Sequence, residues 1–181
     1  MRIVPVAEIP KAELVTDFSV EKLNKLWLLF REMSIICLNR DGIGLHAVQV
    51  GIPVEMFVVR HSSTLSCRRD FFDYFFNCYY GPVGEERLNS IEGCLSLDVK
   101  TISLDGAAGP TFRRRFFEVP RWKKVHVKGF KLVQEHGNSI KEEVDFEPDG
   151  IYNSIFQHEL DHGKGMLISD IGKEIHIYRG N

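Results

Sequence analysis

The stretch "FQHELDHGKGM", residues 156–166, places two histidines four positions apart, with a glutamate directly after the first. On an α-helix, residues at this spacing share one face, so the imidazoles of His158 and His162 can reach one cation. Glu159 then points at the open coordination position, an arrangement typical of zinc hydrolases. Catalytic centres of this kind keep three protein ligands and leave one place for water, so a third ligand must lie elsewhere in the chain.

The position of the third ligand separates several classes of metallohydrolase. Metzincins use a third histidine six residues after the second, and Ile168 occupies that position here. A thermolysin-like centre needs a downstream glutamate on another helix, but Glu174 is the only glutamate after His162, and little chain remains for that helix. Upstream, Cys94 lies in the loop-like stretch "SIEGCLSL". On its own it is equally well a core residue; beside a histidine pair that lacks a partner, it is predicted to complete a Cys-His-His site for iron or zinc.

Length and charge bound the class of protein. The chain has 181 residues, which suits a single domain spanning 1–181. A net charge of -2 gives no electrostatic reason to expect a nucleic acid or a membrane as partner. Acidic residues near the N-terminus, Glu8, Glu13 and Asp17, are unlike a signal peptide or an organellar presequence. We expect a soluble cytoplasmic protein, or an organellar one from which a transit peptide has been removed.

The cysteines do not indicate a disulfide scaffold. The chain has 4 cysteines, widely spread and without a CxxC pair. Besides Cys94, we expect Cys37, Cys67 and Cys78 to be buried small apolar residues in a reducing compartment.

Apolar periodicity predicts few helices and more strands. Residues 19–38 have apolar side chains at helical intervals after Ser19, a plausible N-cap, and predict an amphipathic helix that covers a sheet. Strands are expected at 54–59, in the aromatic stretch 71–81, and as two strands joined by a turn within 123–147. A second helix is expected at 151–162. This order favours the α+β class.

Residues 98–119 have the character of an inserted loop or hairpin. They contain a flexible "DGAAGP" and end in the arginine triplet 113–115 beside two phenylalanines. Such a cluster can grip phosphates of RNA, but it is short and the chain is not basic. A solvated face is therefore the favoured interpretation. The C-terminal segment 167–181 is short, and residues 174–178 alternate in the manner of a strand.

Three motifs, in this order along the chain, resemble those of the peptide deformylase family: "GIGLHAVQ" (42–49), "EGCLS" (92–96) and "QHELDH" (157–162). The resemblance extends from about Val4 to Asp170. It implies the deformylase fold, an α+β arrangement in which antiparallel and mixed sheets surround a central metal-binding helix.

The resemblance also implies an activity, the removal of the formyl group from the N-formylmethionine of newly synthesised polypeptides by attack of a metal-bound hydroxide. Cys94, His158 and His162 would hold one divalent ion per chain, natively Fe(II), with nickel, cobalt or zinc as substitutes. A bound cation lowers the pKa of its water from about 15.7 toward 7. Glu159 would serve as general base and acid.

Further roles follow from the same resemblance. The Gln49 amide and the Leu95 backbone N–H would stabilise the oxyanion. Glu92 and Arg121 would orient the loop that carries Cys94.

The resemblance also assigns a substrate site. The backbone of Ile43, Gly44 and Gly93 would pair with an extended peptide. The methionine side chain would enter an apolar pocket made by Ile43, Ile151, Ile155 and His158. The chain departs from the family at His46, where alanine is usual; we expect this imidazole to narrow the cleft, to bond the substrate or to shift the motif.

The sequence is also compatible with two other functions. One is a diverged metallo-amidohydrolase or peptidase with another substrate, and the other is a non-catalytic homologue that keeps the metal as structure. Gln49 and Glu159 argue against the second, because neither is needed merely to hold metal. The expected partners are N-formylmethionyl nascent peptides, with transient ribosome contact. The short C-terminus leaves little room for a docking helix, and we expect a monomer without a specific nucleic-acid partner.

Overall fold

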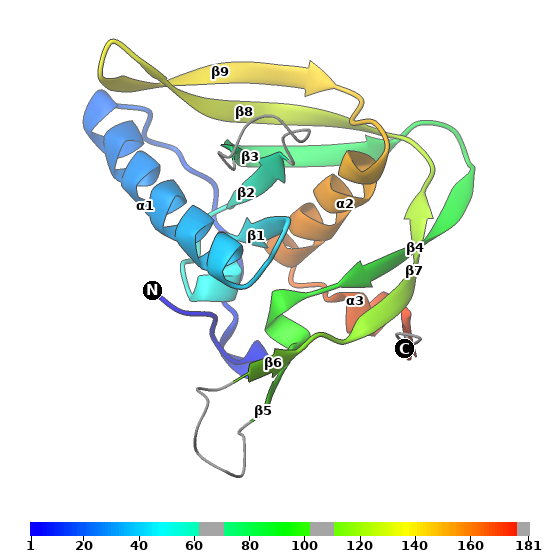
Figure 1. The fold of residues 1–181 in the computed structure, drawn as a ribbon. Helices are drawn as coiled ribbons and strands as arrows, with labels where there is room; N and C mark the ends of the chain where they lie inside the picture. The colour runs from blue at the N-terminus through cyan, green and yellow to red at the C-terminus, as the bar shows by residue number, and fades with distance from the viewer. Residues whose placement is uncertain (62–70, 102–110, 177–181) are drawn as a thin grey trace, which may run out of the picture.

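The computed structural model describes residues 1–61, 71–101 and 111–176. Cys67 and the end of the chain from residue 177 therefore lie outside the described residues. The described residues form two main sheets and two principal helices, α1 and α2, arranged as Figure 1 shows. Within the described ranges, no helix is long and apolar enough to cross a membrane.

The larger sheet has five strands in the order β1-β2-β3-β8-β9, and all of its pairings are antiparallel. Its strands are β1 (Gly44–His46), β2 (Met56–His61), β3 (Phe71–Pro82), β8 (Val125–Glu135) and β9 (Asn138–Phe146). The expected aromatic strand and the expected strand pair are thus present. β8 and β9 are joined at His136 and Gly137, whose φ values of 48° and 83° are those of a tight hairpin turn.

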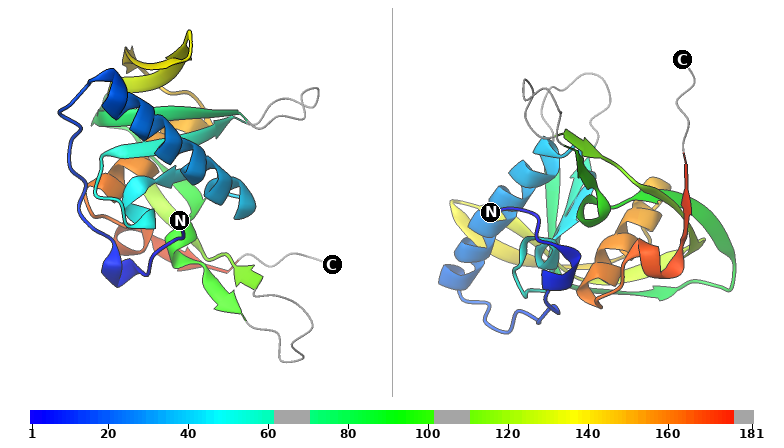
Figure 2. Two further views of the ribbon diagram at one scale, coloured as in Figure 1. Left: turned by 90° about the vertical axis from the view of Figure 1, so that its left-hand side faces the viewer. Right: turned by 90° about the horizontal axis from the view of Figure 1, so that it is seen from below.

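The helices pack on opposite faces of this sheet. Strand β2 alternates: Met56 and Val58 are buried in the cluster that contains α1, whereas Phe57 and Val59 are buried in the cluster that contains α2. This alternation follows from the two-residue period of a strand. The right-hand view of Figure 2 shows strands of this sheet between the two helices. Each face of the sheet therefore has its own apolar core.

Helix α1 (Val20–Asn39) matches the expected amphipathic helix. The Ser19 hydroxyl accepts from the Lys22 backbone N–H at 3.3 Å and caps its first turn. Its buried side chains follow one stripe: Leu23, Leu26, Phe30, Met33, Ser34 and Cys37. Helix α2 (Ile151–Gly163) begins at the expected residue and carries both histidines. It follows Gly150, whose φ of 55° suits glycine.

The second sheet has three strands in the order β10-β7-β4. They are β4 (Arg87–Gly93), β7 (Phe116–Trp122) and β10 (Lys173–Ile175). β4 ends directly before Cys94. The described residues also include the short 3-10 helices η1 (Val6–Glu8), η2 (Ala47–Val50) and η3 (Leu95–Leu97). The position of β4 beside α2 brings the second and third sequence motifs together (Figure 1).

The segment 98–119 forms a hairpin at its start and joins the second sheet at its end. β5 (Val99–Thr101) pairs with β6 (Thr111–Arg113), and the tip between them lies outside the described residues. Its last residues belong to β7, so the expected insertion is partly an element of the main fold.

The C-terminal segment forms a short helix, α3 (Ile168–Ile171), and then β10, which pairs with β7. The Arg115 guanidinium donates twice to the Glu174 carboxylate, at 2.8 and 2.5 Å. Arg114 donates to the backbone carbonyls of Arg40 and Asp41, at 2.6 and 3.0 Å. Two members of the arginine triplet are therefore engaged within the chain and are not a free surface for phosphates.

Candidate metal centre and active site

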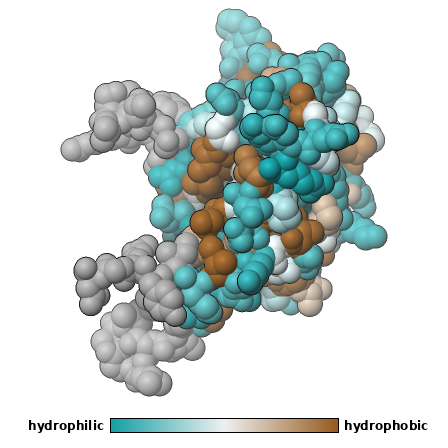
Figure 3. Space-filling model, turned by 90° about the vertical axis from the view of Figure 1, so that its right-hand side faces the viewer, coloured by the Kyte–Doolittle hydropathy of each residue, from teal (hydrophilic) through white to brown (hydrophobic). Residues whose placement is uncertain are grey.

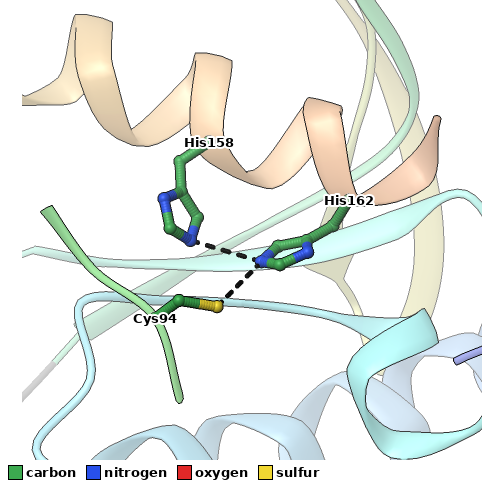
Figure 4. Close-up of side chains that lie close together, drawn as sticks. All are labelled: Cys94, His158 and His162. Carbon is green, nitrogen blue, oxygen red and sulfur yellow. Dashed lines mark hydrogen bonds between the residues drawn. The ribbon is translucent and has the colours of Figure 1, made fainter. Parts of the chain in front are cut away.

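The side chains of Cys94, His158 and His162 point toward one another (Figure 4). Their ligand atoms are all within 4.8 Å of one another. His162 Nε2 lies 3.4 Å from Cys94 Sγ and 3.2 Å from His158 Nε2. Helix α2 supplies both imidazoles from one face, and the end of β4 delivers the thiol from the opposite side. The structure thus brings together the three residues predicted as metal ligands.

The hydrogen bonds of His158 fit a metal ligand. Its Nδ1 lies 2.9 Å from Glu92 Oε2, and a carboxylate is an acceptor, so Nδ1 carries a proton and Nε2 faces the centre. Burial opposes a second proton, but the bonds to Cys94 and Glu92 raise the pKa of this imidazole well above its ordinary value, so a bound cation would take the place of a proton on Nε2. Burial lowers the pKa of His162 well below its ordinary value, and the neighbouring His158 adds to this effect. A neutral imidazole is the form that binds a metal. A thiolate and two imidazoles suit zinc, iron, cobalt or nickel, so the residues present fit the expected divalent ion.

A buried charge network supports this centre from behind. Arg121 donates to both oxygens of Glu92, at 2.7 and 2.8 Å, and to Asp161 Oδ2 at 2.5 Å. The Tyr80 hydroxyl donates to the other oxygen of Asp161 at 2.9 Å. Burial opposes ionisation of Glu92, but the bonds from Arg121 and His158 outweigh it and lower the pKa of this carboxyl to about 2. Glu92 is therefore an anion that is tied to both the network and the centre.

Sequence reasoning found the pair of Glu92 and Arg121 but missed Asp161 and Tyr80. Asp161 lies within the quoted motif, beside His162, and a helical acid that is buried requires a partner. This requirement is the signal from which a buried partner for Asp161 could have been predicted. It could not identify the partners, because Arg121 and Tyr80 lie 40 and 81 positions away along the chain.

Glu159 is buried against strand β1. A side chain at Gly44 would displace this carboxyl, since a Cβ there would lie 2.2 Å from Glu159 Oε1. In the described part of the chain, Glu159 Oε2 has no hydrogen-bond partner although it is buried. Burial raises the pKa of this carboxyl to about 7. The site therefore contains a carboxyl group whose free oxygen is available to a molecule in the cleft.

Gln49 lies beside the thiol, on the turn η2. Its Nε2 is 3.0 Å from Ser96 Oγ and 3.6 Å from Cys94 Sγ. Its Oε1 accepts from the His46 backbone N–H at 2.8 Å. Leu95 follows Cys94 as the first residue of η3, where a backbone N–H has no partner within its own helix. Both predicted oxyanion donors thus lie next to the predicted ligand Cys94.

A cleft opens onto this centre between α2, β1 and β4. The residues that line it include Ile43, Gly44, Gly93, Ile151 and Ile155, together with His158, Glu159, Gln49 and Leu95. Five residues predicted to bind substrate are therefore in one cleft with the predicted catalytic residues. Three isoleucines form an exposed apolar rim: Ile43, Ile91 and Ile151, with exposed fractions of 48%, 63% and 64%. Figure 3 shows apolar side chains exposed along the middle of one face, between polar ones.

His46 is placed differently from the expectation. It does not line this cleft, and its side chain is fully buried. The imidazole instead lies 3.2 Å from Glu55 Oε1 and accepts from the Val48 backbone N–H at 3.3 Å. Gly44 and His46 are two residues apart in β1 and share the face of the sheet that packs against α2. Gly44 lies against Glu159 at the cleft, whereas the His46 imidazole lies further along this face, against Glu55 and the Phe57 ring.

The polypeptide deformylase family model matches residues 9–105 and 108–176. The chain belongs to the polypeptide deformylase family. Among curated members, it is 33% identical over 132 residues to a peptide deformylase of Chromohalobacter salexigens, an alignment that covers 73% of this chain and 62% of that protein. It is 28% identical to a peptide deformylase of Psychrobacter arcticus, over 89% of this chain and 73% of that protein.

Solved structures of deformylases share this fold. A probable peptide deformylase from Synechococcus phage S-SSM7 superposes with a TM-score of 0.69 and 25% identity, covering 94% of this chain and 99% of that one. Peptide deformylase 1B of Arabidopsis thaliana superposes with a TM-score of 0.66 and 23% identity, over 94% of this chain and 81% of that one. The expected α+β deformylase fold is confirmed.

Proposed function

We propose that this deformylase-family chain hydrolyses the formyl group from the N-formylmethionine of newly synthesised polypeptides. One observation carries the proposal: His158, which lies with Cys94 and His162, lines a cleft that is also lined by the buried Glu159 carboxyl and the Gln49 amide. Holding a metal needs only the first three residues. The additional acid and amide donor are the groups that hydrolysis of an amide requires.

The proposed ligands are Cys94, His158 and His162, with one Fe(II) ion per chain and nickel, cobalt or zinc as substitutes. When bound, such an ion supplies Lewis-acid chemistry, which lowers the pKa of water and polarises a carbonyl oxygen. Glu92 holds the Nδ1 proton of His158 and thereby keeps its Nε2 free for coordination. Arg121 fixes Glu92 in that position through two hydrogen bonds.

Glu159 moves the proton in the proposed reaction. Its free Oε2 accepts a proton from the attacking water and then delivers it to the nitrogen of the leaving amine. Gln49 Nε2 and the Leu95 N–H donate to the oxyanion that develops on the formyl oxygen. Ser96 accepts from Gln49 Nε2 at 3.0 Å and orients that amide before substrate arrives.

Peptide binding uses the two strands that flank the cleft. β1 is the first strand of one sheet and β4 is the last strand of the other, so each has an edge that an extended peptide can join. We propose that the backbones of Ile43, Gly44 and Gly93 bond to the peptide, and that Ile43, Ile151, Ile155 and His158 receive the methionine side chain. Main-chain pairing tolerates any sequence after the first residue, as nascent chains require. We also propose that the protein is a monomer and that it contacts the ribosome transiently.

Release of formate from formyl-Met-Ala-Ser tests the proposal, with protein purified anaerobically in the presence of Fe(II). Glu159→Ala serves as the matched variant, because it removes the acid and leaves the three ligands in place. We expect formate release by the wild type and its loss in the variant, at equal metal content. Absence of release by metal-loaded wild type would reject the deformylase assignment.

A further inference from the structure

His46 lies outside the cleft, yet both of its ring nitrogens are engaged. Nδ1 lies 3.3 Å from the Val48 backbone N–H, and Nε2 lies 3.2 Å from Glu55 Oε1. The ring also stacks on Phe57, with centroids 6.1 Å apart. Because Nδ1 accepts a hydrogen bond, a neutral ring carries its proton on Nε2. The Glu55 carboxylate accepts a hydrogen bond from this Nε2–H. Glu55 thereby favours the tautomer in which Nδ1 is an acceptor.

The group that His46 holds is the turn η2, on which Gln49 lies. The first N–H groups of a helical turn lack partners within the turn, and His46 Nδ1 supplies one for Val48. In return, Gln49 Oε1 accepts from the His46 backbone N–H at 2.8 Å. This is a reciprocal capping box. Since Oε1 is bound toward His46, Nε2 of the same amide must point the other way, toward Cys94 and Ser96.

On its other side, Glu55 packs closely against the end of helix α2. A Cβ at Gly163 would lie 2.1 Å from Glu55 Oε2, so only glycine leaves room for the carboxylate. Gly163 directly follows His162 in the chain. Glu55 therefore contacts both the cap of η2 and the end of the helix that carries the histidines. Through His46 and Glu55, the Gln49 turn is held in register with that helix.

We propose that His46, held by Glu55, is a positioning residue for Gln49. Its imidazole keeps the first turn of η2 closed, and this directs the Gln49 amide protons at the space beside Cys94. The proposal rests on the proposed function only in that Gln49 Nε2 acts there as an oxyanion donor. His46 itself touches neither the substrate cleft nor the reacting atoms.

Steady-state formate release separates positioning from simple loss of structure. His46→Ala removes the cap acceptor and is expected to lower kcat about tenfold with KM nearly unchanged, because a misaligned donor costs less than the roughly 100-fold of a lost one. His46→Asn retains a cap acceptor and is expected to keep more of kcat than His46→Ala. In a Gln49→Ala background, His46→Ala is expected to have no further effect on kcat. An equal tenfold loss in both backgrounds would overturn the proposal.

A second readout does not depend on activity. In zinc-loaded protein with 15N-labelled glutamine, the Gln49 side-chain amide protons are expected to exchange with solvent about tenfold faster in His46→Ala than in the wild type. Unchanged exchange would overturn the positioning role, whatever the kinetics show. If the wild type releases no formate, the deformylase assignment fails, and the exchange measurement still decides whether His46 positions Gln49. Should His46→Ala not fold, Glu55→Ala gives the same comparison, because the imidazole then lacks the partner that selects its tautomer.

Discussion

Arg121 and Glu92 face each other through two parallel hydrogen bonds, from Nε at 2.7 Å and from Nη2 at 2.8 Å. This bidentate pair is almost completely buried, with side-chain exposures of 2% and 8%. It connects the second sheet to helix α2, because Glu92 also bonds to His158 and Arg121 also bonds to Asp161. The pair is therefore both a structural link and a means of orienting a proposed ligand.

Replacement of Arg121 by Met is expected to destabilise the fold by about 3–5 kcal/mol, because it leaves two buried carboxylates, Glu92 and Asp161, without their cation. Urea unfolding of the zinc-loaded protein measures this loss. Arg87→Met is the matched control: Arg87 is exposed and lies over the Trp122 ring at 3.7 Å, and its loss should cost less than about 1 kcal/mol. If the two variants lost similar amounts of unfolding free energy, Arg121 would not be the cation that stabilises the two buried carboxylates.

Glu92→Gln is expected to weaken metal binding by about 10-fold to 100-fold, because it removes the charge that orients His158 and one acceptor for Arg121. Competition with a chelator for zinc measures the affinity. Glu86→Gln provides the control, since Glu86 forms an exposed ion pair with Lys123 on the surface. Equal zinc affinity in Glu92→Gln and the wild type would show that this carboxylate does not act on the centre.

Most of the larger sheet and both principal helices were predictable from apolar periodicity. The missed strands have physical reasons. β4 is largely exposed and carries no apolar alternation, because it is an edge strand of a small sheet. β7 contains Pro120, which argues against a central strand. The pairing with β10 ends at Glu118, so β7 has only one neighbour at Pro120, and the proline is tolerated.

The residues of the candidate site were predictable because their chemistry is local in three short motifs. The partners that hold them were not, since a sequence gives no distance between segments far apart. Gln49 and Ser96 lie 47 positions apart, and their bond depends on how η2 meets η3. His46 was misplaced for a related reason: its position in the motif suggested the cleft, whereas β1 turns its side chain toward Glu55.

Substitution of Cys94 by Ala is expected to abolish the thiolate-to-metal absorption of the cobalt-loaded protein and to reduce its cobalt content. The reason is that Cys94 Sγ is the sulfur that lies with the two imidazoles. Cys78→Ala is the control: Cys78 is buried elsewhere, among the aromatic residues of β3 and α2, and burial raises the pKa of its thiol to about 12. A cobalt spectrum that survives in Cys94→Ala would rule out this thiol as a ligand.

Gly44→Ala is expected to reduce kcat by about 100-fold while metal content stays unchanged. A Cβ at this position would lie 2.2 Å from Glu159 Oε1, so the carboxyl must move, and a displacement of about 1 Å in a reacting group has an effect of this size. Gly81→Ala is the control, because a Cβ at Gly81 meets no atom within 4 Å. Formate release and bound metal are measured on the same preparations. If Gly44→Ala keeps the wild-type kcat, the position of Glu159 against β1 is not required for proton transfer. If it loses metal as well as activity, the strand supports the centre as a whole and not this carboxyl alone.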